Sequence, residues 1–114
     1  MARPQMIVQY TKQDDQNWLR TGSNYAVQAI YFDQQQGARY RIISDDAGTP
    51  ALFPVIDFTI VDGSLPASWC AHVHANGDFE LSPPAWLEQG FWVRFFDNDA
   101  DAKRVFELNA SSLR

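Results

Sequence analysis

Cys70, His72 and His74 are the residues whose types and spacing could support chemistry, because they alternate along one short segment. Alternate side chains of a β-strand point to the same face, so these three would lie together. A thiolate and two imidazoles are good ligands for zinc or copper. No fourth ligand accompanies them and the spacing is not that of a zinc finger, so we expect no metal and no other cofactor. The pattern favours an exposed strand that faces a partner. The alternating residues Trp69, Ala71 and Val73 would then be turned to the core.

The two histidines also allow a catalytic interpretation, in which they act as acid and base on a phosphate. Such a site needs a cation to stabilise the charge that develops in the transition state. The only lysines are Lys12 and Lys103, and neither is close in sequence, although an arginine could substitute. An acidic surface would also repel a phosphate substrate. A small enzyme that uses His72 and His74 is therefore only an alternative. Our main prediction is a protein with no catalytic residue.

Acidic residues gather where we expect turns or strand ends, which is typical of a small domain that binds a basic partner. These groups are Asp14-Asp15, Asp45-Asp46, Asp57 with Asp62, Asp78 with Glu80, and the run from Asp97 to Asp101. The last run resembles the start of a calcium loop, but its sixth position is Ala102 and its twelfth is Leu108. A helix start explains these carboxylates better, because the helix dipole stabilises negative charge at a helix N-terminus.

The overall composition limits the possible functions. The 114 residues suffice for one domain, 1–114, with a single core. The formal charge of −5 argues against a nucleic acid or a membrane as partner, because both require a basic face. A single cysteine allows no internal disulfide, which fits a reducing compartment. No apolar stretch has the length of a signal peptide or a membrane span, so we expect a cytoplasmic protein.

The first part of the chain, 1–81, reads as a series of short β-strands separated by turns. Strands are expected over 6–10, 25–32, 39–43, 51–53, 57–61, 69–74 and 79–81, because these segments are rich in β-branched and aromatic residues. Turn residues fill the gaps at 33–37 and 45–48. Asn76-Gly77 between two apolar runs is the strongest hairpin signal in the chain.

The remainder, 82–114, is expected to be helical. Ser82-Pro83-Pro84 is a good helix start, because proline at the first helical position loses no internal hydrogen bond. Apolar residues then recur near helical spacing, although Gly90 weakens the middle, and Asn98 or Asp99 can cap a second helix. The predicted fold is α+β and mainly β, with antiparallel sheets forming a small, partly open barrel or sandwich of about seven strands. One or two C-terminal helices pack on it.

Several stretches together resemble a known class of bacterial proteins. The first half carries Met6-Ile7-Val8-Gln9-Tyr10, Thr21-Gly22 before the segment 25–30, Tyr40-Arg41-Ile42-Ile43-Ser44-Asp45-Asp46-Ala47-Gly48, and Leu52-Phe53-Pro54 before Phe58. This series resembles small domains with a Src-homology-3-like, partly open β-barrel. The segment from Pro84 to Asp99 is similar to the tail of immunity proteins from contact-dependent inhibition and other polymorphic toxin systems.

The resemblance implies a cytoplasmic immunity protein that binds the C-terminal domain of a cognate toxin in a one-to-one complex. Such toxins are often nucleases with a basic cleft, which an acidic surface would block without catalysis. Contact residues vary with the toxin, so the candidates come from their position on expected turn edges. They are Asp45, Asp46, Asp78 and Glu80, then Asp57 and Asp62, with His72 and His74 beside them. A non-catalytic adaptor domain that binds another protein is the alternative.

Overall fold

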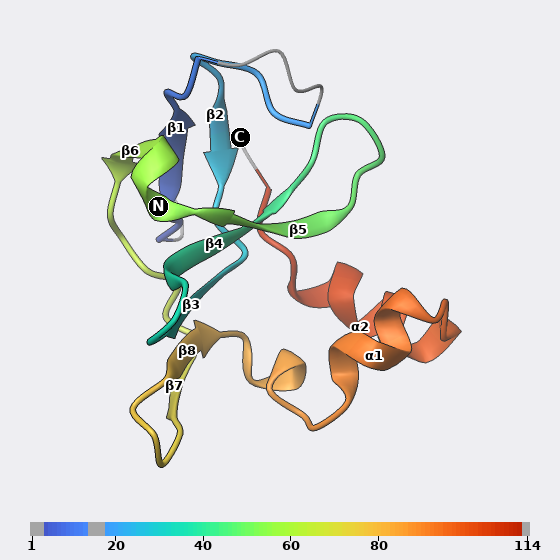
Figure 1. Cartoon of the computed structure of the whole chain (residues 1–114). Helices are drawn as coiled ribbons and strands as arrows, with labels where there is room; N and C mark the ends of the chain where they lie inside the picture. The colour runs from blue at the N-terminus through green and yellow to red at the C-terminus, as the bar shows by residue number, and fades with distance from the viewer. Residues whose placement is uncertain (1–3, 14–17, 113–114) are drawn as a thin grey trace.

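Two antiparallel sheets and a C-terminal pair of helices form the computed structural model, which describes residues 4–13 and 18–112 (Figure 1). The smaller sheet has the order β2-β1-β6, made of β1 (Ile7–Tyr10), β2 (Asn24–Ala26) and β6 (Phe58–Asp62). The larger sheet has the order β5-β4-β3-β8-β7, made of β3 (Ala29–Asp33), β4 (Gly37–Ile43), β5 (Pro50–Pro54), β7 (Cys70–Val73) and β8 (Phe79–Ser82). The acidic pair Asp14-Asp15 lies outside the described residues.

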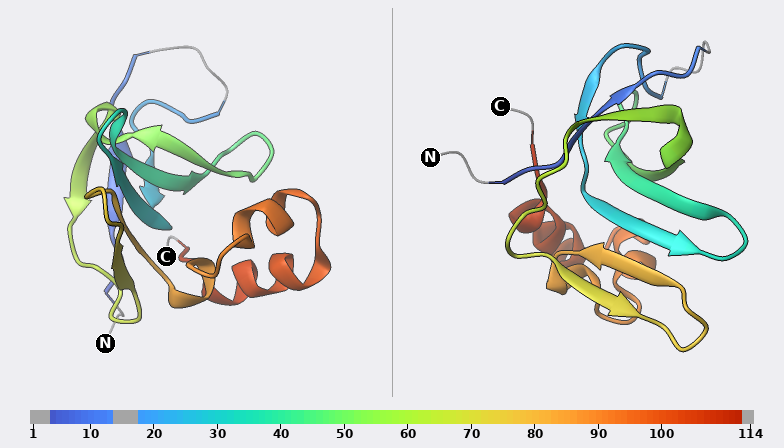
Figure 2. Two further views of the ribbon diagram at one scale, coloured as in Figure 1. Left: turned by 60° about the horizontal axis from the view of Figure 1, so that its bottom comes forward. Right: turned by 90° about the vertical axis from the view of Figure 1, so that its left-hand side faces the viewer.

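The larger sheet lies between the smaller sheet and the helices, so each of its faces has its own core. Successive residues of β4 point to opposite faces of the sheet, which explains this arrangement. Ile42 packs with Val8 of the smaller sheet, while Ile43 packs on the helical cluster. Figure 2 shows the helices gathered on one side of the strands. The predicted fold class is confirmed: the protein is mainly β, its sheets are not closed, and the helices are C-terminal.

The prediction of one central strand over 25–32 is wrong, because this segment contributes to both sheets and brings the number of strands in residues 4–13 and 18–112 to eight. The N–H of Val27 donates to the carbonyl of Met6 in the smaller sheet, at 2.9 Å. The next N–H, that of Gln28, donates to the carbonyl of Arg41 in the larger sheet, at 2.8 Å. Apart from Gln28 the run is apolar, because the chain is buried where it passes between the sheets.

The buried side chain of Gln28 holds the C-terminal segment against this crossing point. Its amide N–H donates to the carbonyl of Ser111 and its amide oxygen accepts from the N–H of Ser111, both at 2.8 Å. The side-chain amide thereby pairs with the backbone of Ser111 as a neighbouring strand would. These two bonds supply the hydrogen-bond partners that a buried polar side chain requires.

The single helix expected to start at Ser82-Pro83-Pro84 is divided in two. A 3₁₀ turn, η2 (Pro84–Trp86), is followed by α1 (Phe91–Phe96), which begins after Gly90 with a φ of +80°. This left-handed backbone suits glycine and interrupts the helix. A second 3₁₀ turn, η1 (Val55–Asp57), leads into β6.

The second predicted helix is confirmed as α2 (Ala100–Asn109). The carboxylate of Asp99 accepts from the N–H of Ala102 at 2.9 Å, so Asp99 is the N-cap and Asn98 is not. Within the described ranges, no helix reaches the length and apolar character needed to cross a membrane.

Candidate functional site

One row of side chains crosses four strands of the larger sheet and marks a polar patch on the face that the helices cover elsewhere. The strand register pairs Tyr31 with Arg39 on β4 and with Glu80 on β8, and it pairs Glu80 with His72 on β7. Paired residues of adjacent strands point to the same face. The sheet therefore places a guanidinium, a phenol, a carboxylate and an imidazole side by side, although they come from distant parts of the sequence.

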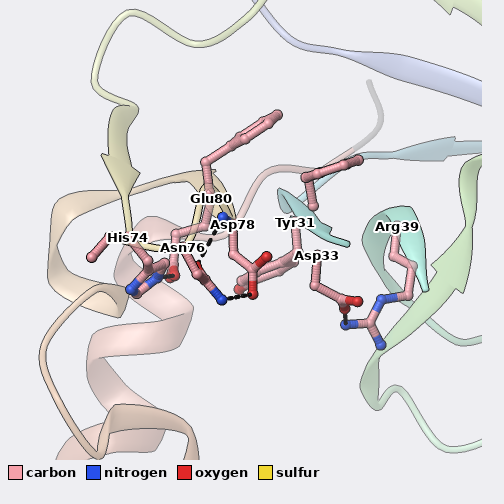
Figure 3. Close-up of a pocket in the computed structure, with 10 residues that line it drawn as sticks. Tyr31, Asp33, Arg39, His74, Asn76, Asp78 and Glu80 are labelled. Atoms are coloured by element: carbon pink, nitrogen blue, oxygen red, sulfur yellow. Dashed lines mark hydrogen bonds and ion pairs between the residues drawn. The ribbon is translucent and has the colours of Figure 1, made fainter. Parts of the chain in front are cut away.

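A cleft of about 500 Å³ opens beside this row, between the β3–β4 hairpin and the β7–β8 hairpin (Figure 3). Its charged lining consists of three carboxylates, from Asp33, Asp78 and Glu80, and the guanidinium of Arg39. With His74 neutral, these groups carry a formal charge of −2. The cleft is thus an acidic recess with aromatic walls, which suits a cationic group. The remaining residues that line it are Tyr31, Phe32, His74, Ala75, Asn76 and Phe79.

Two tight turns fix the mouth of the cleft. The predicted hairpin at Asn76-Gly77 is confirmed, since the N–H of His74 donates to the carbonyl of Asp78 at 2.8 Å and Gly77 has a φ of +94°. The N–H of Gln34, in the β3–β4 turn, donates to Oδ1 of Asp78 at 3.2 Å. The side-chain amide of Gln34 also donates to the carbonyl of Asn76. These bonds join the two hairpins and hold Asp78 at their junction.

Two of the three carboxylates of the cleft lie next to a basic side chain. Nη2 of Arg39 lies 3.0 Å from Oδ2 of Asp33, and Nε2 of His74 lies 2.9 Å from Oε2 of Glu80. The ring of His72 meets that of His74 edge to face, with centroids 4.5 Å apart. Each ionised carboxylate can accept about four hydrogen bonds, so these pairs leave acceptor positions for a bound cation.

A buried arginine forms the boundary between the cleft face and the helices. Arg41 is only 6% exposed, and its guanidinium lies over the ring of Trp92, 3.7 Å from the centroid. It donates to the carbonyl of Pro50 at 2.7 Å and to the hydroxyl of Tyr31 at 3.1 Å. Burial lowers the pKa of Arg41, and burial also raises the pKa of Tyr31, with Arg41 opposing and Glu80 reinforcing that rise. The helix α1 thereby closes one end of the polar face.

The expectation that Ala71 and Val73 face the core is wrong. All four residues of β7 are exposed, and Val73 is 67% exposed. Only Trp69, just before the strand, packs partly against the core. The physical reason is position, because β7 is the edge strand of the larger sheet and its hairpin extends beyond the smaller sheet that covers β3 and β4 (Figure 1). The expected exposure of this strand is confirmed.

The metal interpretation gains no support from the geometry. In residues 4–13 and 18–112, no group of three or more His, Cys, Asp or Glu side chains is arranged to hold a metal ion. The lone cysteine, Cys70, is free and exposed.

The structure separates the other acidic candidates from the cleft. Asp45 and Asp46 lie in the turn after β4, at the opposite end of that strand from Arg39, roughly 20 Å along the extended chain. The hydroxyl of Tyr25 donates to Oδ2 of Asp45, and burial together with this bond raises the pKa of Tyr25. The hydrogen bond from Ser44 lowers the pKa of Asp46. The carboxylate of Asp45 thus joins this turn to β2, and that of Asp46 is bonded within the turn.

Asp57 and Asp62 lie in a third place, at the two ends of β6 in the smaller sheet. The backbone carbonyl of Asp57 accepts from the N–H of Thr11 at 2.9 Å, which joins the loop after β1 to η1. Oδ1 of Asp62 accepts from the N–H of Ser64 at 2.9 Å, and this bond lowers the pKa of Asp62. Of the eight candidates, the structure therefore brings together His72, His74, Asp78 and Glu80.

Asp33, Arg39 and Tyr31 belong to the site but were not among the candidates. The local signal for Asp33 was its place at the start of a turn, where its carboxylate accepts from the N–H groups of Gln35 and Gln36 at 2.9 and 2.6 Å. Nothing in the sequence indicates that this turn lies against the Asn76-Gly77 turn, because that contact depends on the pairing of β3 with β8.

No family model matches this chain, and neither a curated protein nor a solved structure is significantly similar to it. The resemblance to immunity proteins therefore stays a prediction.

Proposed function

We propose that this protein is a cytoplasmic immunity protein that binds and neutralises the toxic domain of a cognate secreted toxin. The partner in this proposal is basic, as a nuclease domain is, and the complex contains one copy of each protein. The protein acts by blocking the basic active cleft of the toxin with an acidic surface, and has no catalytic role of its own.

The observation that carries the proposal is the acidic cleft between the two hairpins. Three carboxylates from separate strands and turns converge there, and only one guanidinium offsets them. A concave surface of one sign concentrates its field and attracts a partner of the opposite sign, which accelerates association. The exposed side chains of Phe96 and Val93 on α1 add apolar contact area that slows dissociation.

Co-expression with the protein encoded directly upstream tests the proposal, because an immunity gene is expected to follow its toxin gene. We expect the upstream protein, or its C-terminal domain, to arrest growth when produced alone. Growth should return when this protein is produced with it, and the two should co-purify as a one-to-one complex. Lethality that persists despite co-expression, with both proteins present and soluble, would contradict the proposal.

A small enzyme is the second candidate, and the pairing of His74 with Glu80 favours it. A histidine whose Nε2 lies 2.9 Å from a carboxylate, at the edge of a cleft, has the geometry of a general base. Substituting both His72→Ala and His74→Ala should abolish any catalytic activity of this protein, by 10²-fold or more. Under the immunity proposal the double variant instead remains an inhibitor, with affinity reduced by about tenfold or less. Turnover and toxin inhibition measured on the same preparation distinguish the two.

A further inference from the structure

The outer edge of β7 carries backbone groups that pair with nothing in the described parts of the chain. β7 lies at the end of the larger sheet and pairs only with β8. The N–H of His74 donates to Asp78, so in the alternating antiparallel pattern Cys70, His72 and His74 direct their backbone groups toward β8. The N–H and C=O groups of Ala71 and Val73 therefore point outward. A row of unpaired groups is a template for one more strand.

The other three edges of the two sheets carry features that hinder such pairing. β5 is bounded by Pro50 and Pro54, and proline has no N–H to donate. The pairing of β6 with β1 is interrupted by a register shift opposite Ile7 and Val8, which twists the strand locally. β2 is only three residues long. β7 has a regular register, no proline, no glycine and no formally charged residue, so among the sheet edges that the structure describes it is the one left open.

The side chains around this edge indicate what would pair with it. On one face lie His72 and His74, with Glu80 on the next strand and the acidic cleft beyond it. On the other face lie Ala71 and the exposed Val73. Adjacent strands are about 4.8 Å apart, so a lysine or arginine on an added strand can reach the carboxylate of Glu80 across β7. Small or β-branched residues at the alternate positions would cover Ala71 and Val73.

We infer that β7 is the docking edge for an extended, basic segment of a protein partner, which adds as a sixth strand to the larger sheet. Its alternate Lys or Arg side chains lie on the face of the acidic cleft, and its intervening residues are small or β-branched. The identity of the partner as the toxin rests on the proposed function, whereas the added strand and its charge pattern come from the edge itself.

The test uses the full chain, labelled with ¹⁵N, and a blocked peptide that alternates four lysines with three valines. We expect shifts in the amide signals of 70–74 and slower hydrogen exchange at the amides of Ala71 and Val73. A peptide with glutamate in place of lysine should bind at least tenfold more weakly. Shifts near Asp33 and Glu80 without slowed exchange at Ala71 and Val73 would overturn the inference, as would equal binding of the two peptides or no binding of the lysine peptide.

Substitution at position 71 separates the backbone from the side chain. Ala71→Pro removes an outward N–H and should lower peptide affinity at least tenfold, while Ala71→Thr keeps the N–H and should bind as the unmodified protein does. An amide spectrum that keeps the signals of β3, β4 and β8 shows that the proline variant is folded; if it is not, Val73→Pro offers the same test. Equal binding of the proline and threonine variants would overturn the inference.

The toxin assay distinguishes failure of this inference from failure of the proposed function. If a folded Ala71→Pro variant still neutralises the upstream toxin as the unmodified protein does, the edge is not the docking site, and the immunity proposal stands. If the unmodified protein fails to neutralise the toxin but binds the lysine peptide along β7, the immunity proposal fails and the docking edge stands.

Discussion

Removing the three carboxylates of the cleft, by Asp33→Asn, Asp78→Asn and Glu80→Gln, is expected to abolish protection against the toxin. Each substitution keeps the shape of the side chain and a hydrogen-bond acceptor, so the bonds from Gln34 and Gln35 can persist. What is lost is the negative charge that faces a basic partner. At about 1–2 kcal/mol for each contact, the affinity should fall by about 10² to 10⁴-fold. Growth rescue and the dissociation constant of the purified complex measure the effect.

A matched variant controls for net charge. Asp46→Asn, Asp57→Asn and Asp62→Asn also remove three carboxylates, but these residues lie in the turn after β4 and at the ends of β6. Long-range steering would suffer equally in both variants, whereas direct contact would be lost in only one. We expect the control to weaken binding by less than about tenfold, mainly through slower association. If the two triple variants behave alike, the cleft is not the contact surface.

Truncation of Trp86 should produce the largest loss of stability among single substitutions in the helical part. Trp86 is 2% exposed, stacks on Phe106 with centroids 4.9 Å apart, and meets Trp92 edge to face at 5.6 Å. Trp86→Ala removes this contact area and leaves a cavity between the sheet and α2. The expected cost is about 3–5 kcal/mol, which is a large fraction of the stability of a domain of this size. Urea unfolding followed by circular dichroism measures it.

Phe96→Ala is the control for that prediction. Phe96 belongs to the same aromatic group and contacts Trp92, but its side chain is 52% exposed, so truncation creates no enclosed cavity. We expect a loss of at most about 1 kcal/mol. Equal destabilisation by Trp86→Ala and Phe96→Ala would mean that the helices do not pack on the sheet as described.

Several elements could be predicted because their cause is local. Asn76-Gly77 supplies the positive φ that a tight hairpin needs, and the turn is present. Asp99 carries an oxygen that satisfies a free N–H at the start of α2, and it is the cap. Both signals act within about four residues, so no knowledge of the rest of the chain is required.

Other predictions failed where a distant segment decides the outcome. Nothing local in 25–32 marks the end of one strand and the start of another, and the division between Val27 and Gln28 follows from separate bonds to Met6 and Arg41. Likewise, Ala71 and Val73 suit a core position by type, but the sheet order places β7 at an edge, where nothing in the described chain covers them. Propensity specifies an extended backbone and does not specify which face will be buried.

The sequence by itself determined the mainly β class, the helical C-terminal part, and the acidic character of the surface. Composition and short-range spacing control these properties, since each depends on individual residues or on neighbours in the chain. Only the tertiary structure decided which carboxylates act together. The register of β3 with β4 and β8 places Asp33, Asp78 and Glu80 around one cleft and leaves Asp45 and Asp57 elsewhere. Register is a property of paired segments, and for β3 with β8 these lie far apart in the sequence, so a pattern within one short segment does not specify it.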